Sequence, residues 1–337
     1  MAPPSRLSWL SSAVSLLATC ANISPVAATS SSKRGLCFTP NATTSQDNYI
    51  WTRKPSDLTW YYNYGASPSP VYGNLTQDDF EFVPMLWGAP EDSNDVTFIN
   101  TVKGLINNGR NITHVMAFNE PDGPTSWGGS DVDPTKAAEV WITNIQPLRD
   151  MGLKVGLPAC TGGWGGIPWT NQFLGNCSKL ISAATNGKTK NCTYDFIPLH
   201  WYGPFDALAS HIGNWQNSFN ATKIWVTEYN FDNQDLPTTQ AFYNMSSEYM
   251  DRLEVVERYS IFAAFRSDAS NVGPNATMLS AGGELTDIGA WYLGRDATGV
   301  APTDTKKASG AVSLTPGGWS TFALMSAAAF AVASLLL

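Results

Sequence analysis

Short apolar runs, rich in β-branched and aromatic residues, alternate along this chain with longer segments in which apolar residues recur every three or four positions. The first pattern is typical of buried strands and the second of helices that cover a sheet. Strands are predicted at Gly35–Thr39, Leu58–Tyr64, Phe82–Trp87, His114–Asn119, Lys154–Cys160, Phe196–Tyr202, Lys223–Tyr229 and Tyr259–Phe265. Helices are predicted at Asp95–Asn108, Thr135–Met151, Thr238–Val255 and Glu284–Leu293.

Strands that alternate with helices predict a parallel sheet. Eight of them in a chain of this length favour a closed (β/α)8 TIM barrel over an open doubly wound sheet, because one barrel takes about 250 residues. We therefore expect an α/β protein with a single catalytic domain over residues 35–300. No phosphate-binding glycine fingerprint follows the first strand, so no dinucleotide cofactor is expected.

The N-terminal end has the features of a processed segment. Arg6 precedes the apolar stretch Leu7–Ala18, and small-residue sites such as Val26-Ala27-Ala28 follow. This order is typical of a secretory signal. The dibasic pair Lys33-Arg34 offers a second cut just before Gly35, so residues 1–34 are predicted to be a signal peptide with a short pro-segment.

The C-terminal end fits a lipid-anchor signal. No charged residue follows Lys307. The segment after it contains small residues, then a polar spacer, then the apolar tail Trp319–Leu337. After a short linker at 301–309, residues 310–337 are predicted to be removed when a glycosylphosphatidylinositol (GPI) anchor is attached at Ser309. The alternative is a transmembrane helix, since about 20 apolar residues span a bilayer. The lack of basic residues after the tail favours the anchor, and with it a secreted protein held at the cell surface or wall.

Charge and histidine spacing narrow the choice of partners. Of 20 basic residues, three (Arg6, Lys33 and Arg34) lie in the predicted leader, so 17 remain against 28 acidic residues and the net charge is −11. Such a surface repels nucleic acid and anionic polymers and favours a neutral substrate. The three histidines show no metal-ligand spacing, so neither a metal nor another cofactor is expected. We expect a monomer.

Cysteines and glycan acceptors agree with export. Four cysteines remain after the leader, and Cys177 and Cys192 flank one polar loop and are the expected disulfide. For Cys37 and Cys160 the sequence leaves two alternatives, a second disulfide or two buried free thiols. Acceptor triplets for N-glycosylation occur at Asn41, Asn74, Asn111, Asn176, Asn191, Asn220, Asn244 and Asn275. Together with a signal peptide, so many triplets indicate a glycosylated surface protein.

Two glutamates close strand-like runs among aromatic residues. Glu120 follows His114–Phe118, and Glu228 ends Trp225-Val226-Thr227-Glu228, 108 residues later. At roughly 30 to 40 residues for each strand-helix unit, this gap is three units of a barrel, whose catalytic groups lie at the carboxyl ends of its strands. Glycosidic-bond hydrolysis needs two such carboxyls. The sequence therefore predicts a barrel glycosidase.

The chain resembles a known family over roughly residues 35 to 295. An Asn-Glu-Pro triplet on the fourth strand and a glutamate on the seventh are similar to the clan A retaining glycosidases. The ordered motifs that resemble glycoside hydrolase family 128, a group of fungal β-1,3-glucanases, are Gly35-Leu36-Cys37-Phe38, Trp60-Tyr61-Tyr62-Asn63-Tyr64, Pro84-Met85-Leu86-Trp87-Gly88, Leu199-His200-Trp201-Tyr202-Gly203 and Trp225-Val226-Thr227-Glu228-Tyr229.

The resemblance implies roles for four of these residues. Glu120 matches the acid/base and Glu228 the nucleophile. Asn119 matches an asparagine that binds the sugar 2-hydroxyl, with a strand-end cap as its alternative. Tyr202 could hold Glu228 in its charged, aligned form.

His200 lies two residues before Tyr202 on the same strand face, so it either contacts sugar or satisfies a core hydrogen bond. Asp122 either tunes the acid/base or is a turn residue, and the turn is favoured.

Aromatic residues are the expected sugar platforms, because flat rings pack on the C–H faces of carbohydrates. Trp87, Trp164 and Trp201 are the predicted platforms, and Tyr62 and Tyr64 point to the same side of the second strand as Trp60. Trp169 is expected on the loop after the fifth strand. Core positions are expected for the tryptophans on helical segments, which are Trp51, Trp141, Trp215 and Trp291.

Together these features predict a retaining endo-β-1,3-glucanase that acts on wall or nutrient glucan. A transglycosylase, which passes the glycosyl group to another sugar, uses the same site. A glucan-binding wall protein without catalysis is the alternative from another class.

Overall fold

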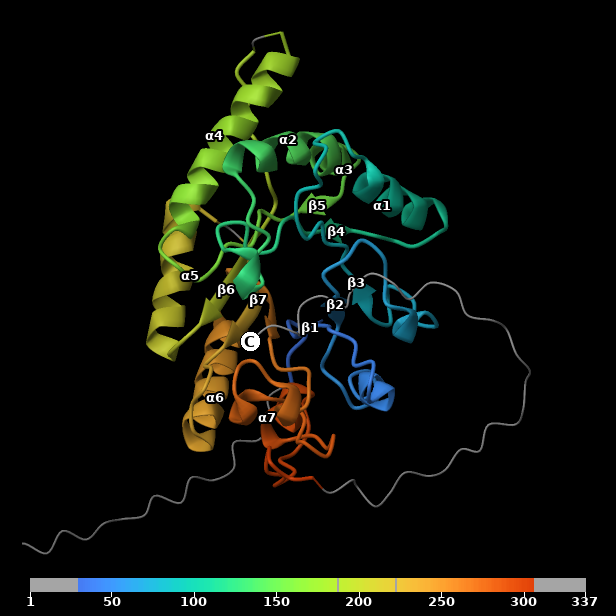
Figure 1. Cartoon of the computed structure of the whole chain (residues 1–337), viewed down its shortest axis with the longest axis vertical. Coiled ribbons are helices and arrows are strands. Elements are labelled where there is room, and N and C mark those ends of the chain that lie inside the picture. The colour runs from blue at the N-terminus through green and yellow to red at the C-terminus, as the bar shows by residue number, and fades with distance from the viewer. Residues whose placement is uncertain (1–29, 187, 222, 306–337) are drawn as a thin grey trace, which may run out of the picture. The chain divides into compact units, whose positions relative to one another are not determined.

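The computed structural model describes residues 30–186, 188–221 and 223–305 (Figure 1). Its strands are β1 (Gly35–Cys37), β2 (Trp60–Tyr62), β3 (Glu81–Phe82), β4 (His114–Val115), β5 (Lys154–Val155), β6 (Ile197–Tyr202), β7 (Ile224–Asn230) and β8 (Val256–Ile261). Its α-helices are α1 (Thr97–Asn107), α2 (Pro134–Asn144), α3 (Gln146–Asp150), α4 (Gly166–Ala184), α5 (Phe205–Phe219), α6 (Leu236–Arg252) and α7 (Asp287–Tyr292).

The strands pair in parallel and in chain order, as predicted, but they form three short sheets instead of one continuous barrel ladder. The sheets are β1-β2-β3, β4-β5 and β6-β7-β8. Single parallel bridges link them at Met85↔Met116, Gly156↔Phe196 and Arg34↔Tyr259. Pro84 and Pro158 fall in the predicted runs that shrink to β3 and β5, and proline lacks the N–H that would continue a ladder.

The four predicted helices occur, and the structure adds two. The predicted helix Thr135–Met151 is divided at Ile145 into α2 and α3, since Pro147 follows closely and proline interrupts a helix. α4 and α5 were not predicted. α4 begins in a glycine-rich loop and contains Pro168 and Gly175, which are poor helix formers and weaken the helical pattern. Along one side of β6 and β7, α4, α5 and α6 lie in a row (Figure 1). The connections after β1 and β2 carry only the 3₁₀ turns Ser45–Tyr49 and Pro70–Tyr72.

Two apolar clusters hold the domain together. The larger one fills the space between strands and helices and contains the buried indoles Trp51, Trp141 and Trp215 as expected, with Trp291 packed against it half-buried. The smaller one collects side chains from the inward faces of the strands: Cys37, Trp60, Tyr62, Val83, Met85, Met116, Phe196 and Trp225. At its centre the rings of Phe196 and Trp225 stack at 4.0 Å between centroids. This inner cluster forms the floor on which the polar groups at the strand ends rest.

The disulfide Cys177–Cys192 is present and ties α4 to the segment that leads into β6. Cys37 and Cys160 are buried free thiols, so the alternative of a second bond does not apply. The Cys37 thiol donates to the carbonyl of Ile261, 3.2 Å away.

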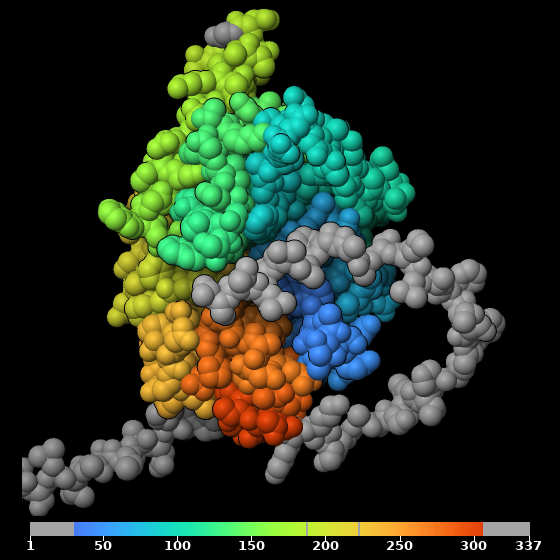
Figure 2. Space-filling view, viewed as in Figure 1, coloured from blue at the N-terminus to red at the C-terminus, as the bar shows by residue number. Residues whose placement is uncertain are grey.

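Lys33 and Arg34 belong to the folded domain, although the sequence analysis assigns them to a removed leader. The Lys33 ammonium donates to the carbonyls of Met250 and Leu253. Arg34 is buried and pairs with Asp57 at 3.0 Å. Its backbone forms a parallel bridge with Tyr259 of β8, so the first described residues lie beside the last strand. On the surface, the blue N-terminal part of the domain borders the orange C-terminal part (Figure 2). A cut after Arg34 would remove a buried ion-pair partner, which argues for a domain that begins before Lys33.

The predicted signal peptide, apart from its last residues, and the predicted anchor site Ser309 with its tail lie outside the described residues. Within the described ranges, no helix combines the length and the apolar character that a membrane crossing needs.

Candidate active site

Glu228 lies on β7, and its side chain points toward the end of β6 and the loop after β2. The side chain is 8 % exposed. In the parallel pairing of β6 with β7, Glu228 is the register partner of His200. Since alternate residues of a strand face the same side, His200 and Tyr202 both point toward Glu228.

Glu120 follows β4 in an unusual backbone conformation. Its φ is +42°, in the left-handed region that a residue with a side chain seldom adopts. The amide N–H of Glu120 donates to the carbonyl of Ala159 at 2.7 Å, and its own carbonyl accepts from the N–H groups of Gly123 and Ser130. Such strain persists only where the surroundings fix it, and it is concentrated at functional sites. These bonds hold the Glu120 carboxyl at the mouth of the strands.

His200 lies between the two glutamates. Its Nδ1 is 2.9 Å from Oε1 of Glu120 and 3.6 Å from Oε2 of Glu228. One ligand atom from each of the three residues lies within 4.8 Å of the others. Three such atoms could hold a divalent cation. Both oxygens of Glu228, however, already accept hydrogen bonds from protein hydroxyls, which favours use of the site without a metal.

Those two hydroxyls belong to tyrosines from different strands. Tyr64, just after β2, donates to Oε1 of Glu228 at 2.8 Å, and Tyr202 at the end of β6 donates to Oε2 at 2.7 Å. Behind Tyr64, the Tyr62 hydroxyl donates to the carbonyl of Thr227. The carboxylate is therefore held in one orientation from both sides.

Burial and charge oppose each other at this cluster. Burial raises the pKa of Glu228 and nearby Glu120 adds to this, whereas His200 and the two tyrosine hydroxyls favour the charged carboxylate. For His200, burial favours the neutral ring, but Glu228 and Glu120 together raise its pKa above the usual value. The charged form of Glu228 therefore forms at a higher pH than that of an exposed glutamate.

Asn119 supports the loop beside Glu120 and leaves one polar atom unused. Its Nδ2 donates to the carbonyl of Gly128 at 3.1 Å. Its Oδ1 is buried and has no partner among the described residues. An unpaired buried acceptor costs about 1–3 kcal/mol, so a ligand hydroxyl at this position would be favoured.

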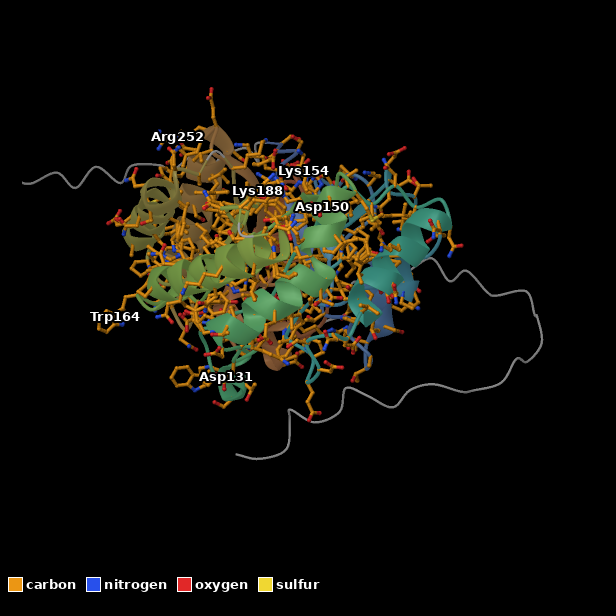
Figure 3. All side chains as sticks on the ribbon, turned by 90° about the horizontal axis from the view of Figure 1, so that it is seen from above. Asp131, Asp150, Lys154, Trp164, Lys188 and Arg252 are labelled. Carbon is orange, nitrogen blue, oxygen red and sulfur yellow. A yellow bond between two sulfur atoms is a disulfide. The ribbon has the colours of Figure 1, made fainter. Side chains whose placement is uncertain are left out.

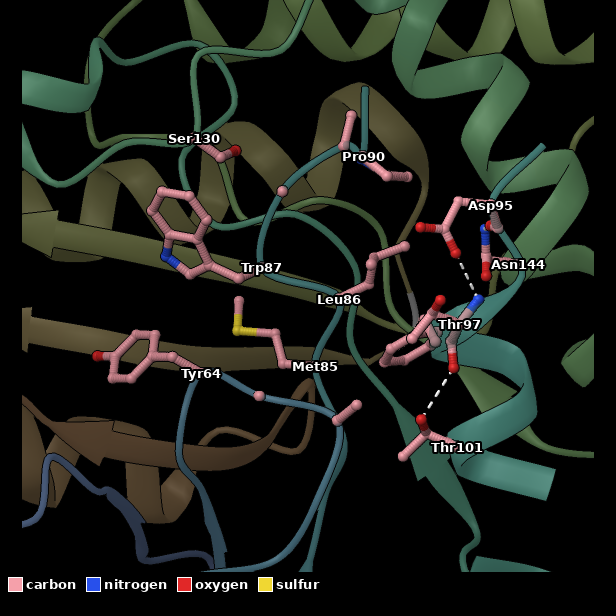
Figure 4. Close-up of a pocket in the computed structure, with 15 residues that line it drawn as sticks. Tyr64, Met85, Leu86, Trp87, Pro90, Asp95, Thr97, Thr101, Ser130 and Asn144 are labelled. Carbon is pink, nitrogen blue, oxygen red and sulfur yellow. Dashed lines mark hydrogen bonds between the residues drawn. The ribbon is translucent and has the colours of Figure 1, made fainter. Parts of the chain in front are cut away.

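The two glutamates open into a pocket of about 340 Å³ that Trp87, Trp127 and Phe262 also line. A neighbouring cavity of about 400 Å³ shares Tyr64 and Trp87 with it and continues toward Asp95 and Asn144 (Figure 4). Trp87 is 37 % exposed and lies where the two spaces meet. A chain of sugars could therefore run from the glutamates across Trp87 into the second space.

Two of the predicted platforms do not join this pocket. Trp201 alternates with His200 and Tyr202, so its ring leaves the opposite face of β6. Trp164 is 99 % exposed and projects from the surface (Figure 3). Both line a separate pocket between α4 and α5. Trp169 is not on a loop as predicted, because it lies in α4, where its buried Nε1 donates to the carbonyl of Val132.

Sequence reasoning missed Trp127 as a pocket residue and Tyr64 as a donor to the nucleophile. Trp127 is 83 % exposed on the loop that follows Glu120, within Pro124-Thr125-Ser126-Trp127-Gly128. An aromatic residue among turn formers directly after a catalytic motif was the available signal. Asp122 lies in a turn, the reading that was favoured, closed by the Gly123 N–H donating to the Glu120 carbonyl. Its carboxyl accepts from the backbone N–H and the hydroxyl of Thr161, both at 2.8 Å.

The glycan acceptors differ in exposure. The exposed ones are Asn74, Asn111, Asn191 and Asn220. The half-buried ones are Asn41, Asn176, Asn244 and Asn275. The Nδ2 of Asn275, the atom that would carry a glycan, donates to the carbonyl of Gln234 at 2.9 Å. The acceptors remain predictions.

Comparison with known proteins supplies the family. The profile of the family described as "Glycosyl hydrolase catalytic core" matches residues 35–292. The chain belongs to this family. It is similar to alkali-sensitive linkage protein 1 of Schizosaccharomyces pombe (strain 972 / ATCC 24843), with 29 % identity over 273 residues that cover 78 % of this chain. The chain matches only 44 % of the length of that relative.

Solved structures of glycoside hydrolase family 128 (GH128) are similar to this domain. A curdlan-specific exo-β-1,3-glucanase from Blastomyces gilchristii is 25 % identical, with 77 % of this chain and 97 % of that one covered and a TM-score of 0.57. An endo-β-1,3-glucanase from Pseudomonas viridiflava is 22 % identical, with 80 % and 100 % covered and a TM-score of 0.61. An oligosaccharide-binding protein from Cryptococcus neoformans is 22 % identical, with 80 % and 97 % covered and a TM-score of 0.57. The resemblance to GH128 that the sequence motifs indicate is confirmed.

Removal of the Tyr64 hydroxyl should shift the pH dependence of the GH128 site. Tyr64→Phe deletes a hydrogen bond to the charged form of Glu228, so the pKa of this carboxyl rises and the acid limb of the kcat/KM profile moves to higher pH. A hydrogen bond to a charged group is worth about 1.5 kcal/mol, which corresponds to about one pH unit. Laminarin hydrolysis measured from pH 3 to 8 would show the shift.

Tyr61→Phe is the matched control, since Tyr61 is on the opposite face of β2 and its hydroxyl has no partner among the described residues. An acid limb that stays in place in Tyr64→Phe, or moves equally in Tyr61→Phe, would contradict this role for Tyr64.

Proposed function

We propose that this protein is a retaining endo-β-1,3-glucanase that cleaves its substrate by double displacement. The observation that carries the proposal is the pair of glutamates, which present carboxyl oxygens within 4.8 Å of each other. Retaining glycosidases hold their two carboxyl groups about 5–5.5 Å apart, whereas inverting enzymes need about 6.5–9.5 Å to admit a water between them. The spacing supports direct attack by a protein nucleophile.

In the first step the Glu228 carboxylate attacks the anomeric carbon while the Glu120 carboxyl gives its proton to the departing glycosidic oxygen. The C–O bond to the leaving sugar breaks, and an ester bond to Glu228 forms. In the second step Glu120 takes a proton from water, and the water oxygen replaces Glu228 on the anomeric carbon. Tyr64 and Tyr202 orient the nucleophile, and His200 holds Glu120 toward it.

We infer that the eight parallel strands form one (β/α)8 barrel around this site. The support comes from the three bridges that join the short sheets, since one of them links the first strand segment to the last. An inward-facing cluster of apolar side chains beneath the glutamates agrees with a filled barrel interior.

A neutral glucan is the substrate that the pocket fits. Aromatic side chains Trp87, Trp127 and Phe262 surround the glutamates, and the chain carries a net negative charge, which disfavours anionic polymers. The adjoining cavity past Trp87 offers room for further sugar units. The β-1,3 linkage rests on the GH128 relatives that cleave it.

One similar structure, from Cryptococcus neoformans, is an oligosaccharide-binding protein, so binding without turnover is the second candidate. The complete set of Glu120, Glu228, His200 and the two tyrosines favours catalysis here. A transglycosylase would give products longer than its substrate, which sizing of laminarin oligosaccharide products would reveal.

Release of reducing ends from a panel of β-glucans, with variants of each glutamate, tests the proposal. Glu228→Ala should lower turnover by on the order of 10⁴-fold or more, and azide should restore it, because the small anion can enter the vacated space. Glu120→Ala should lose about 10²–10⁴-fold on laminarin but far less on substrates with activated leaving groups. Glu139→Ala, an exposed glutamate on α2, is the control and should leave turnover unchanged. The reverse pattern in the two catalytic variants would exchange their roles, and no hydrolysis by the unaltered protein would refute the activity.

We also propose that the protein is exported and held by a GPI anchor at the cell surface, on the basis of the terminal sequence features. A phosphatidylinositol-specific phospholipase should then release it from intact cells, as a known GPI-anchored protein would be released in the same preparation. Peptides from Trp319–Leu337 in the mature protein would instead identify a retained transmembrane tail.

A further inference from the structure

A second pocket with aromatic and polar side chains lies between α4 and α5, away from the glutamates. It encloses about 580 Å³ and shares no lining residue with the pocket around Glu120 and Glu228. Its walls come from the loop after β5, the end of β6 and the first three turns of α5. The two predicted sugar platforms that miss the catalytic pocket, Trp164 and Trp201, both line it.

One wall of this pocket is built by two parallel rows of side chains on α5. Residues four apart lie on one face of a helix, so Ala207, His211 and Trp215 form one row. Asp206, Ser210 and Asn214, all exposed, form the row beside it. The rings of His211 and Trp215 are buried and back this face of the helix. The exposed carboxylate, hydroxyl and amide of the second row lie in the same pocket as the rings of Trp164 and Trp201, and aromatic area next to hydrogen-bonding groups is the combination that recognises a sugar.

The opposite wall is the loop that presents Trp164. Asp122 fixes the start of the loop through Thr161. Gly162 then passes so close to Trp201 that a Cβ at Gly162 would lie 3.1 Å from the indole ring. The Trp201 ring is therefore held in place against the loop. The Trp164 ring, which is fully exposed, lines the outer side of the pocket.

Two buried polar atoms of residues that line the pocket lack partners. Trp201 Nε1 and His211 Nε2 make no hydrogen bond with any residue in the described part of the chain. Their rings pack together at 5.0 Å between centroids. Burial, with a smaller effect of His200, lowers the pKa of His211 to about 4, so the ring is neutral near pH 7. Asp206 is then the single charged side chain lining the pocket, which suits a neutral ligand.

We propose that this pocket is a second glucan-binding site, which binds a β-1,3-glucan chain without cleaving it. The proposal rests on the proposed function for the identity of the sugar. Trp164 covers one face of a glucose ring, Trp201 and His211 form the floor, and the polar row of α5 binds hydroxyl groups. A polymer bound there stays close to the catalytic pocket of the same molecule, which raises the local concentration of cleavable chain.

Counting the binding sites for laminarihexaose tests the proposal. The full-length protein is used with Glu228→Gln, which stops hydrolysis, and titration calorimetry gives the number of sites and their affinities. Two sites per chain are expected. Adding Trp164→Ala should weaken one site about tenfold, equal to about 1.4 kcal/mol, and leave the other within about twofold. Adding Trp127→Ala, the matched exposed tryptophan of the catalytic pocket, should weaken the other site.

A change in the polar row provides a second variant that keeps the aromatic wall. Asp206→Ala on the exposed face of α5 should weaken only the site that depends on Trp164. A single site that Trp164→Ala leaves unaltered would overturn the second site. A single site that both tryptophan variants weaken would mean one continuous cleft, and would overturn it as well.

The titration and the hydrolysis assay together distinguish failure of the second site from failure of the proposed function. Hydrolysis of laminarin by the unaltered protein with one binding site only would refute this inference and keep the activity. Two sites without any hydrolysis would refute the activity and support the inference.

Discussion

The structure around the strand ends depends on how the buried Glu228 carboxylate is stabilised. A carboxylate that leaves water for an apolar interior must find hydrogen bonds or opposite charge, or take up a proton. Here Tyr64 and Tyr202 donate to its two oxygens, and His200 lies between it and Glu120. The donors come from β6 and from the loop after β2, so the charged form of Glu228 depends on the placement of these strands beside β7.

The inner cluster below the glutamates supports this arrangement through packing. Trp60, Tyr62 and Tyr64 follow one another on the inward side of β2, with ring centroids 6.1 and 4.9 Å apart. At the other end of this column, Arg258 lies over the Trp60 ring at 5.5 Å and pairs with Glu81 at 2.7 Å. Tyr64, which donates to Glu228, is thus at the top of a column of packed rings whose base is fixed by a partly buried ion pair. This packing holds the Tyr64 hydroxyl in place beside Glu228, and fixed donors of this kind are what pre-organisation requires.

Local patterns in the sequence were enough to predict the strand order, the Cys177–Cys192 pair and the family. The two glutamates were found because each closes a buried strand, and the alternation of strand residues placed His200 beside Tyr202. The same alternation puts Trp201 on the other face, so applying it to Trp201 would have corrected the expectation that this ring joins the glutamates. Contacts between distant segments could not be predicted. The ion pair of Arg34 with Asp57 and the position of Trp164 in a pocket beside α5 are examples. Neither contact produces a periodic pattern in the sequence from which it could be predicted.

The central claim is that Glu120 and Glu228 act as a retaining pair, because one oxygen of each carboxyl lies within 4.8 Å of the other, well below the separation of about 6.5–9.5 Å that inverting enzymes need. Proton NMR during the hydrolysis of a β-1,3-glucan, recorded before mutarotation, tests this most directly. Double displacement inverts the anomeric centre twice, so the account predicts that the β-anomer is the first product. Appearance of the α-anomer as the first product would contradict it.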